Sequence, residues 1–137
     1  LEQLSIIKQA ALLAPDHGAL TPWQFIVVQN EGRDRLGEIF YRSACHHQLD
    51  ERNLERAKTL ALRAPVVIIC VAKCVDNAKV PRIEQVQSAG CAVFAMQQAA
   101  FAQGPAGYTW CASEGESFTL PAKSHVAYGA NGYYIYL

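Results

Sequence analysis

The chain has 137 residues, of which 51% are apolar, and its 12 basic residues balance its 12 acidic residues. A chain of this length and composition buries about two thirds of its unfolded surface, which excludes an intrinsically disordered protein. Zero net charge excludes the electrostatic signature of nucleic-acid or anionic-membrane binding and opposes self-association only weakly. We therefore expect one domain over residues 1–137, with no nucleic-acid or membrane partner.

The chain opens with a helical pattern that leads through a turn into a strand. Apolar residues at helical spacing predict a helix over 2–13, which Pro15 ends. The segment that follows, "APDHGALTPW" (14–23), combines turn formers with a histidine and a tryptophan. The β-branched and aromatic run at 23–29 predicts a strand. On composition alone, His17 is a surface turn residue and Trp23 anchors the strand in the core.

Two helices and a strongly apolar strand come next. A helix is predicted over 30–44, with Asn30 as its N-cap, and a second over 49–62, with Asp50 near its start. The unbroken apolar run at 64–73 is typical of a strand covered on both faces. This strand should therefore lie centrally in the sheet.

The second half of the chain is dominated by a long helical segment at 81–104. It is apolar almost all round and rich in small residues, so we expect a buried helix whose cover includes a second subunit. Strands are predicted at 106–112 and 133–137, with a short helix at 120–129 between them. The order of helices and strands indicates an α+β or α/β layered protein.

The five cysteines are odd in number, which favours a reduced chain in the cytoplasm over a disulfide framework. Cys70 and Cys91 both lie in apolar stretches of sequence. Cys70 and Cys74 are about 13 Å apart if both lie on one strand, too far to share a metal ion, so no metal site is predicted. The sequence also contains no GxSxG, GxGxxG or GxxxxGK motif.

Several stretches together resemble the FMN-dependent nitroreductase family. They are "LLAPDHGALTPWQFIVVQNEGRDRLGEIF", "LRAPVVIICVAK", "KVP", "EQ" and "SAGCAVFAMQQAAFAQG". The chain looks most like the short, single-domain NAD(P)H nitroreductase subgroup, over roughly residues 1–110. The resemblance implies an α+β sandwich with a mainly antiparallel or mixed central sheet flanked by helices, and a long buried helix at a homodimer interface.

The resemblance also implies a function and a set of site residues. In the family a nicotinamide cofactor, NADH or NADPH, reduces FMN, and the flavin passes electrons to nitro compounds, quinones or similar small-molecule acceptors. The flavin supplies the redox chemistry, and the protein supplies position and electrostatics. By position, cofactor-binding residues correspond to Leu13, His17, Trp110, Cys111, Ala112 and, at the nicotinamide, Ala99, Ala100, Phe101, Ala102, Gln103 and Gly104. No catalytic side chain is identified.

The sequence departs from the family pattern at positively charged positions. Leu13 and Cys111 stand where the subgroup has arginines. An Arg-Arg-Ser-x-x-Arg segment that grips FMN would lie upstream of residue 1, and we expect the family's C-terminal extension to be missing as well. Each charge-assisted contact to a phosphate is worth about 1.5–3 kcal/mol. FMN binding should therefore be weaker than in the family.

Two alternatives to a flavin enzyme remain open. The first is a dimer with the same fold that has lost FMN and acts as a binding or structural protein. The second is a thiol-based redox protein, in which Cys111 is the cysteine nearest to a site, although a filler role for this thiol is the better reading.

Overall fold

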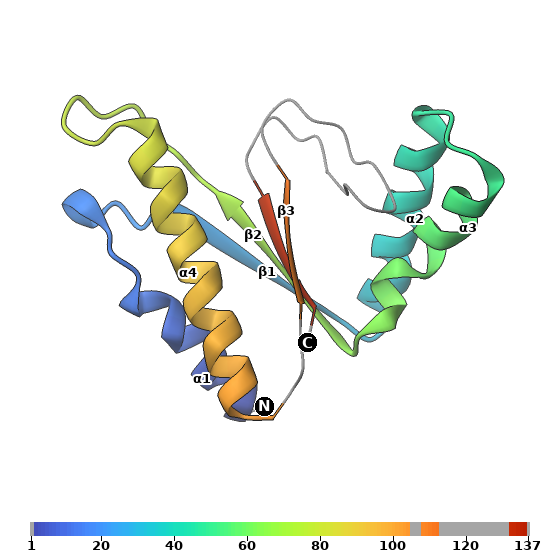
Figure 1. Cartoon of the computed structure of the whole chain (residues 1–137), viewed down its shortest axis with the longest axis horizontal. Helices are drawn as coiled ribbons and strands as arrows, with labels where there is room; N and C mark the ends of the chain where they lie inside the picture. The colour runs from blue at the N-terminus through green and yellow to red at the C-terminus, as the bar shows by residue number, and fades with distance from the viewer. Residues whose placement is uncertain (1, 105–107, 113–131, 137) are drawn as a thin grey trace.

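The structure, a computed structural model, describes residues 2–104, 108–112 and 132–136 (Figure 1). The strands in these ranges form one antiparallel sheet in the order β1-β2-β4-β3. In chain order the elements are α1 (Glu2–Ala10), η1 (Ala11–Leu13), η2 (His17–Ala19), β1 (Trp23–Gln29), α2 (Glu31–His46), α3 (Glu51–Leu60), η3 (Ala61–Arg63), β2 (Val66–Ala72), α4 (Arg82–Ala102), β3 (Tyr108–Ala112) and β4 (Gly132–Tyr136).

The prediction that the apolar run at 64–73 forms a central strand is confirmed. β2 pairs with β1 on one side and β4 on the other, and Val67 and Ile68 are both fully buried although they face opposite sides of the sheet. A strand that contributes to cores on both faces has no polar face, which explains its continuous apolar sequence.

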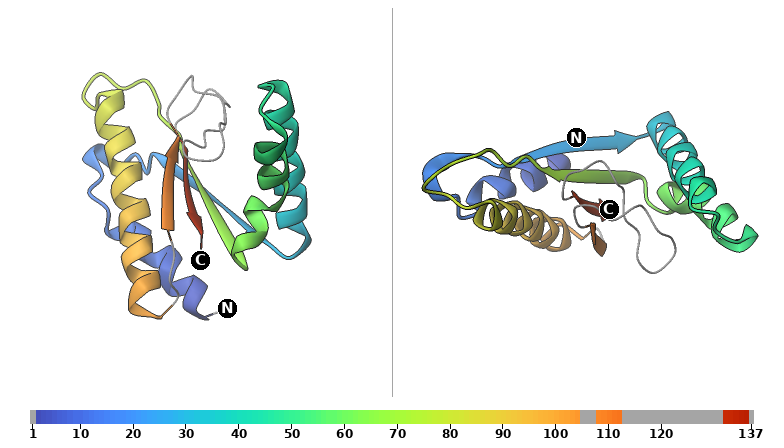
Figure 2. Two further views of the ribbon diagram at one scale, coloured as in Figure 1. Left: turned by 45° about the vertical axis from the view of Figure 1, so that its right-hand side comes forward. Right: turned by 90° about the horizontal axis from the view of Figure 1, so that it is seen from above.

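Each face of the sheet supports its own hydrophobic core. On one face, Ile68, Cys70 and Ala72 of β2 pack with α1 and α4. On the other face, Val67 packs with α2 and α3 around the fully buried Phe40. Figure 2 shows the two helical pairs at opposite sides of the sheet. The expectation of an α+β sandwich with helices flanking a central sheet is therefore confirmed.

The predicted starts of α2 and α3 differ in outcome. The Asp50 carboxylate accepts a hydrogen bond of 2.8 Å from the backbone N–H of Asn53, so the predicted role of Asp50 at the start of α3 is confirmed. Asn30 occupies the N-cap position of α2, as predicted, but it does not act as a side-chain cap. Asn30 has a φ of 49° and its side chain makes no capping hydrogen bond. Asn30 tolerates this left-handed backbone, and the chain uses it as a sharp turn between β1 and α2.

The predicted helix at 2–13 is α-helical only to Ala10 and tightens into the 3₁₀ turn η1 at its end. The turn at 14–23 contains a second short 3₁₀ turn, η2, that the sequence did not predict. The predicted short helix at 120–129 lies outside the described residues. None of the helices in the described part of the chain combines the length and apolar character that crossing a bilayer requires.

Helix α4 is buried along one side only within a single chain. Ala89, Ala92, Val93 and Met96 face the sheet and α1 and are at most 3% exposed. The opposite side is solvent-exposed and carries Ile83, Cys91, Phe94 and Phe101. The expectation that α4 is buried all round is therefore not met within a single chain. Cys91 is exposed for the same reason, whereas Cys70 is fully buried.

Candidate functional site

An open groove of about 810 Å³ lies where the turn after α1 meets the first half of α4. Its volume is within the range of small-molecule sites, and its lining is mixed in character. Leu13, Pro15 and Phe94 supply apolar surface, whereas His17 and Ser88 supply hydrogen-bonding groups. The remaining lining residues are Ala14, Glu84, Gln87, Gly90, Cys91 and Ala95.

The Asp16 carboxylate holds the turn that carries His17. One oxygen accepts the backbone N–H of Thr21 at 2.7 Å, and the other accepts that of Leu20 at 3.2 Å. Gly18 has a φ of 78°, and a Cβ built on it would lie 3.2 Å from Cγ2 of Val80. Both the backbone conformation and the close approach to the loop before α4 favour glycine here. The hydrogen bonds of Asp16 and the close contact of Gly18 therefore hold the backbone on both sides of His17.

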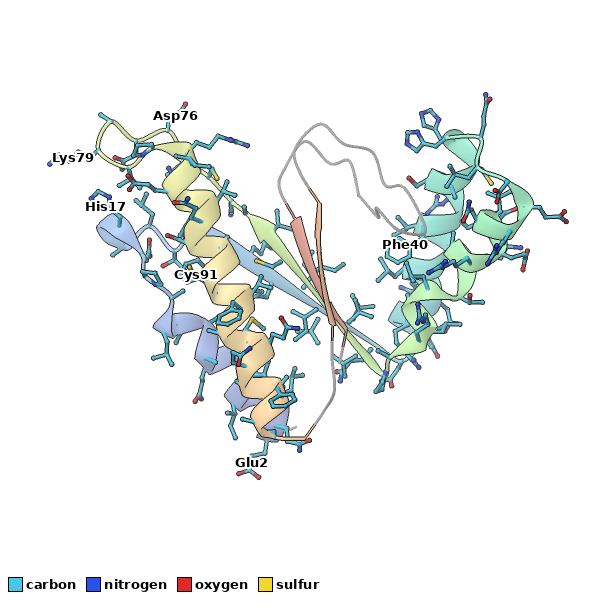
Figure 3. The ribbon with its side chains drawn as sticks, in the orientation of Figure 1. Glu2, His17, Phe40, Asp76, Lys79 and Cys91 are labelled. Atoms are coloured by element: carbon cyan, nitrogen blue, oxygen red, sulfur yellow. The ribbon has the colours of Figure 1, made fainter. Side chains whose placement is uncertain are left out.

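The His17 side chain contacts the first turn of α4, which also lines the groove. Its Nδ1 lies 2.7 Å from Oε2 of Glu84, which is in the first turn of α4. Both side chains are partly exposed, at 59% for His17 and 43% for Glu84. Figure 3 shows His17 beside the start of α4, with Cys91 farther along the same helix. The prediction that His17 is a surface turn residue is confirmed.

Gln85, the residue after Glu84, forms side-chain hydrogen bonds to the loop that precedes α4. Its side chain is 1% exposed. Its Oε1 accepts the N–H of Val75, and its Nε2 donates to the carbonyl oxygens of Val75 and Val80. These three hydrogen bonds satisfy a buried amide that would otherwise be costly. They also fix the first turn of α4, and with it the position of Glu84.

Leu13 lines the same groove as His17 but brings no charge to it. Leu13 is 83% exposed, and the neighbouring Leu12 is 71% exposed. Among the described residues that line the groove, His17 is the one whose side chain can become positively charged. The groove therefore suits a ligand with a flat apolar part better than it suits a bare dianion.

The predicted nicotinamide stretch, Ala99 to Gly104, lies at the far end of α4. Gln103 connects this end to α1, because its Nε2 lies 3.4 Å from the carbonyl oxygen of Gln3. Within the stretch Ala100 is buried, whereas Phe101 is 76% exposed. At 1.5 Å per helical residue, Phe101 lies about 25 Å along the axis from Glu84. A single chain does not bring this stretch to the His17 groove.

The third predicted group, Trp110, Cys111 and Ala112, lies on β3 at the edge of the described sheet. In the register, these residues pair with Tyr134, Tyr133 and Gly132 of β4. Two strands separate β3 from β1, which follows the His17 turn. The structure thus places the predicted site residues in three separate regions of one chain.

The described cysteines differ in their capacity for chemistry. Burial raises the pKa of the Cys70 thiol to about 12, which keeps it protonated and unreactive at neutral pH. Cys45, Cys74 and Cys91 are also free, and Cys91 lines the groove. Within the described ranges, His, Cys, Asp and Glu side chains form no group of three or more suited to holding a metal ion.

The fold and the groove together define an α+β protein with an open groove of small-molecule size beside a long helix whose outer face is apolar. The nitroreductase family model matches residues 1–112, and the chain belongs to this family. The resemblance noted in the sequence is therefore confirmed at the level of family and fold.

Named relatives agree with this assignment. The chain is 48% identical over 103 residues to an Escherichia coli (strain K12) protein named "Putative NAD(P)H nitroreductase YdjA". This match covers 75% of the chain and 56% of that protein, so the chain spans little more than half the length of the relative.

Solved structures with low sequence identity share the fold. A nitroreductase-like family protein from Bacillus cereus superimposes with a TM-score of 0.65 at 20% identity, over 99% of this chain and 74% of that one. The FMN-dependent nitroreductase NfnB from Mycobacterium smegmatis, solved in complex with NADPH, gives a TM-score of 0.62 at 17% identity. That match covers 80% of this chain and 64% of that one.

Sequence reasoning found His17 and Leu13 but missed the partners that α4 contributes to the groove. Glu84 and Gln85 appeared in the sequence only as the pair "EQ" within the resemblance, with no role. His17 and Glu84 are 67 residues apart, so no local pattern could have joined them. The available signal was a histidine in a structured turn and an acid in the first turn of a helix, which becomes informative only once the two elements meet.

Proposed function

We propose that this chain is part of an FMN-dependent oxidoreductase that passes electrons from NAD(P)H to nitro compounds, quinones or similar small-molecule acceptors. One observation carries the proposal. In a chain of the nitroreductase family, the histidine expected at the flavin lines a groove of about 810 Å³ with apolar and hydrogen-bonding walls. That mixed lining suits a flat heterocycle with polar edges.

FMN bound there would supply the hydride and electron chemistry. The chain's own residues would hold and orient it. Leu13 and Phe94 offer apolar surface to a ring system, and the imidazole of His17 offers a hydrogen-bonding group to its polar edge. A protein donor near developing negative charge stabilises a reduced ring.

The same proposal includes a homodimer, with one domain per chain, in the cytoplasm. The outer face of α4 and the adjoining turn expose Leu12, Leu13, Phe94 and Phe101, each by more than 60%. A second copy would cover these side chains and shield the groove from water. It would also allow the stretch Ala99–Gly104 and β3 residues of one chain to reach the groove of the other.

The proposal is tested by the colour and reduction of the intact purified protein. We expect a flavin absorption band, retained on desalting or restored by added FMN, that NADH or NADPH bleaches without oxygen. A colourless protein that takes up no FMN in a calorimetric titration would contradict the proposal.

Leu13 provides a sharper test of where the flavin phosphate lies. Leu13→Arg restores the charge that the family has at this position, so we expect FMN to bind about tenfold more tightly and riboflavin to bind unchanged. Leu12→Arg is the matched control, because Leu12 is also largely exposed but does not line the groove. Equal gains from both variants would show a nonspecific charge effect.

A second candidate function is a dimer of this fold that no longer binds FMN. The apolar Leu13 at an expected arginine position favours it. In that case Leu13→Arg would leave FMN binding undetectable while the dimer remained intact in sedimentation. Stoichiometric FMN uptake by the unaltered protein would exclude this candidate.

A further inference from the structure

The contact between His17 and Glu84 joins two elements that both line the groove. His17 comes from the turn η2, and Glu84 comes from the first turn of α4. Both side chains line the groove, and their nearest atoms are 2.7 Å apart. Surface ion pairs are commonly incidental, so the surroundings decide whether this pair has a role.

The backbone on both sides of the pair is held firmly. Asp16 binds two backbone N–H groups of the turn, and Gly18 packs against Val80. On the other side, the buried Gln85 makes three hydrogen bonds to the loop that leads into α4. Two fixed backbones leave the side-chain torsions of His17 as the main freedom, and the contact with Glu84 removes that freedom.

The chemistry of the contact selects one form of the imidazole. An ionised carboxylate can only accept a hydrogen bond, so Nδ1 of His17 must carry the hydrogen. Nε2 makes no hydrogen bond to any residue that the structure describes. Glu84 therefore occupies one ring nitrogen and leaves the other available to a ligand in the groove. Carboxylates orient metal-binding histidines in the same way.

We propose that Glu84 is a positioning residue for His17, which fixes the orientation and hydrogen placement of the imidazole that faces the flavin. The role of the imidazole toward FMN rests on the proposed function, whereas the effect of Glu84 on the ring does not. Because both side chains are partly exposed, removal of Glu84 should weaken FMN binding only about two- to fivefold.

The ring is tested directly, without any cofactor, by long-range ¹H–¹⁵N NMR of the intact protein. His17→Gln removes one set of imidazole signals and so assigns them. At a pH where the ring is neutral, we expect the unaltered protein to show Nδ1 protonated and Nε2 unprotonated. Glu84→Ala should shift both nitrogens toward a tautomer mixture, and Glu84→Gln should shift them less, because its amide can accept from Nδ1–H but can also donate to an unprotonated Nδ1.

FMN titrations of the same variants connect the ring to the ligand. We expect Glu84→Ala to weaken FMN binding two- to fivefold, Glu84→Gln to weaken it less than Glu84→Ala, and His17→Gln to weaken binding at least as much as Glu84→Ala. Glu51→Ala is the matched control. It also removes an exposed acid from the first turn of a helix, but it lies on α3 away from the groove.

The outcomes separate the two proposals. Unchanged ring-nitrogen shifts in Glu84→Ala would overturn the positioning role, whatever FMN does. Normal FMN binding by His17→Gln would overturn the link between the pair and the flavin. A changed tautomer in Glu84→Ala, together with no FMN uptake by the unaltered protein, would support the role of Glu84 on the ring and contradict the proposed function.

Discussion

The two helical pairs that cover the sheet have opposite outer surfaces. The exposed positions of α2 and α3 are mostly charged, with Glu38 and Arg42 on one helix and Glu55 and Lys58 on the other. Along α4 the exposed positions include Ile83, Phe94 and Phe101, and the turn after α1 adds Leu12 and Leu13. The outer surface of the α2/α3 pair is thus suited to contact with water. The outer surface of the α1/α4 side is apolar, which is typical of an interface, and the groove lies beside it.

The largest expected effect comes from two phenylalanines on the two sides. Phe40 on α2 is fully buried, so Phe40→Ala should lower the free energy of unfolding by about 3–5 kcal/mol. Phe94 on α4 is 62% exposed, so Phe94→Ala should cost about 0.5 kcal/mol in the isolated chain. Urea unfolding at several protein concentrations measures both. If both variants lost the same free energy of unfolding at every protein concentration, the difference between the two sides of the sheet would be contradicted.

A second prediction concerns the close approach of α2 and α3. A Cβ built on Gly37 would clash with the backbone carbonyl oxygen of Lys58, so Gly37→Ala must push the helices apart. We expect a loss of about 1–3 kcal/mol in thermal or urea unfolding. Gly32→Ala in the same helix meets only the end of the Val28 side chain and is the control. Similar losses for both variants would contradict the tight α2/α3 contact.

A third prediction concerns the apolar stripe on α4. If a second copy covers it, Phe94→Glu combined with Phe101→Glu should weaken the dimer about tenfold or more, because two charges would enter an apolar interface. Sedimentation equilibrium measures the dissociation constant. The control, Glu38→Gln combined with Glu55→Gln on the α2/α3 surface, should leave it unchanged. A dimer that resists the α4 variant must use another surface.

The smallest expected effect tests how α2 and α3 begin. Asp50→Ala removes a side-chain cap and should cost about 1 kcal/mol. Asn30 makes no such bond and has a positive φ, so Asn30→Gly should cost nothing or stabilise slightly. Thermal unfolding compares the two variants. A larger loss for Asn30→Gly would mean that Asn30 contributes an interaction absent from this structure.

Local patterns predicted most of the fold because the elements follow short-range rules. The helical spacing of apolar residues located α1 to α4 within a few residues, and the apolar run at 64–73 identified the central strand. The sequence could not show that Asn30 lacks a capping hydrogen bond, because asparagine is common both at N-caps and in left-handed turns. The choice between these conformations depends on how β1 leads into α2, which the residue itself does not encode.

The candidate site was predicted less completely than the fold. Resemblance pointed to His17 and Leu13, and the structure places both on one groove. No local sequence pattern indicated that Glu84 contacts His17, or that Gln85 hydrogen-bonds to the loop before α4. Each contact depends on where α4 packs.

By itself the sequence determined the element types and the apolar character of α4, since these follow from residue propensities and periodicity, and its resemblance to known sequences indicated the family. Only the tertiary structure decided which side of α4 faces the sheet and which remains exposed. It also decided that the His17 turn meets the first turn of α4, while Phe101 lies about 25 Å away. The physical reason is that packing chooses among apolar faces of similar hydrophobicity by shape, and shape is a property of the assembled elements rather than of any one segment.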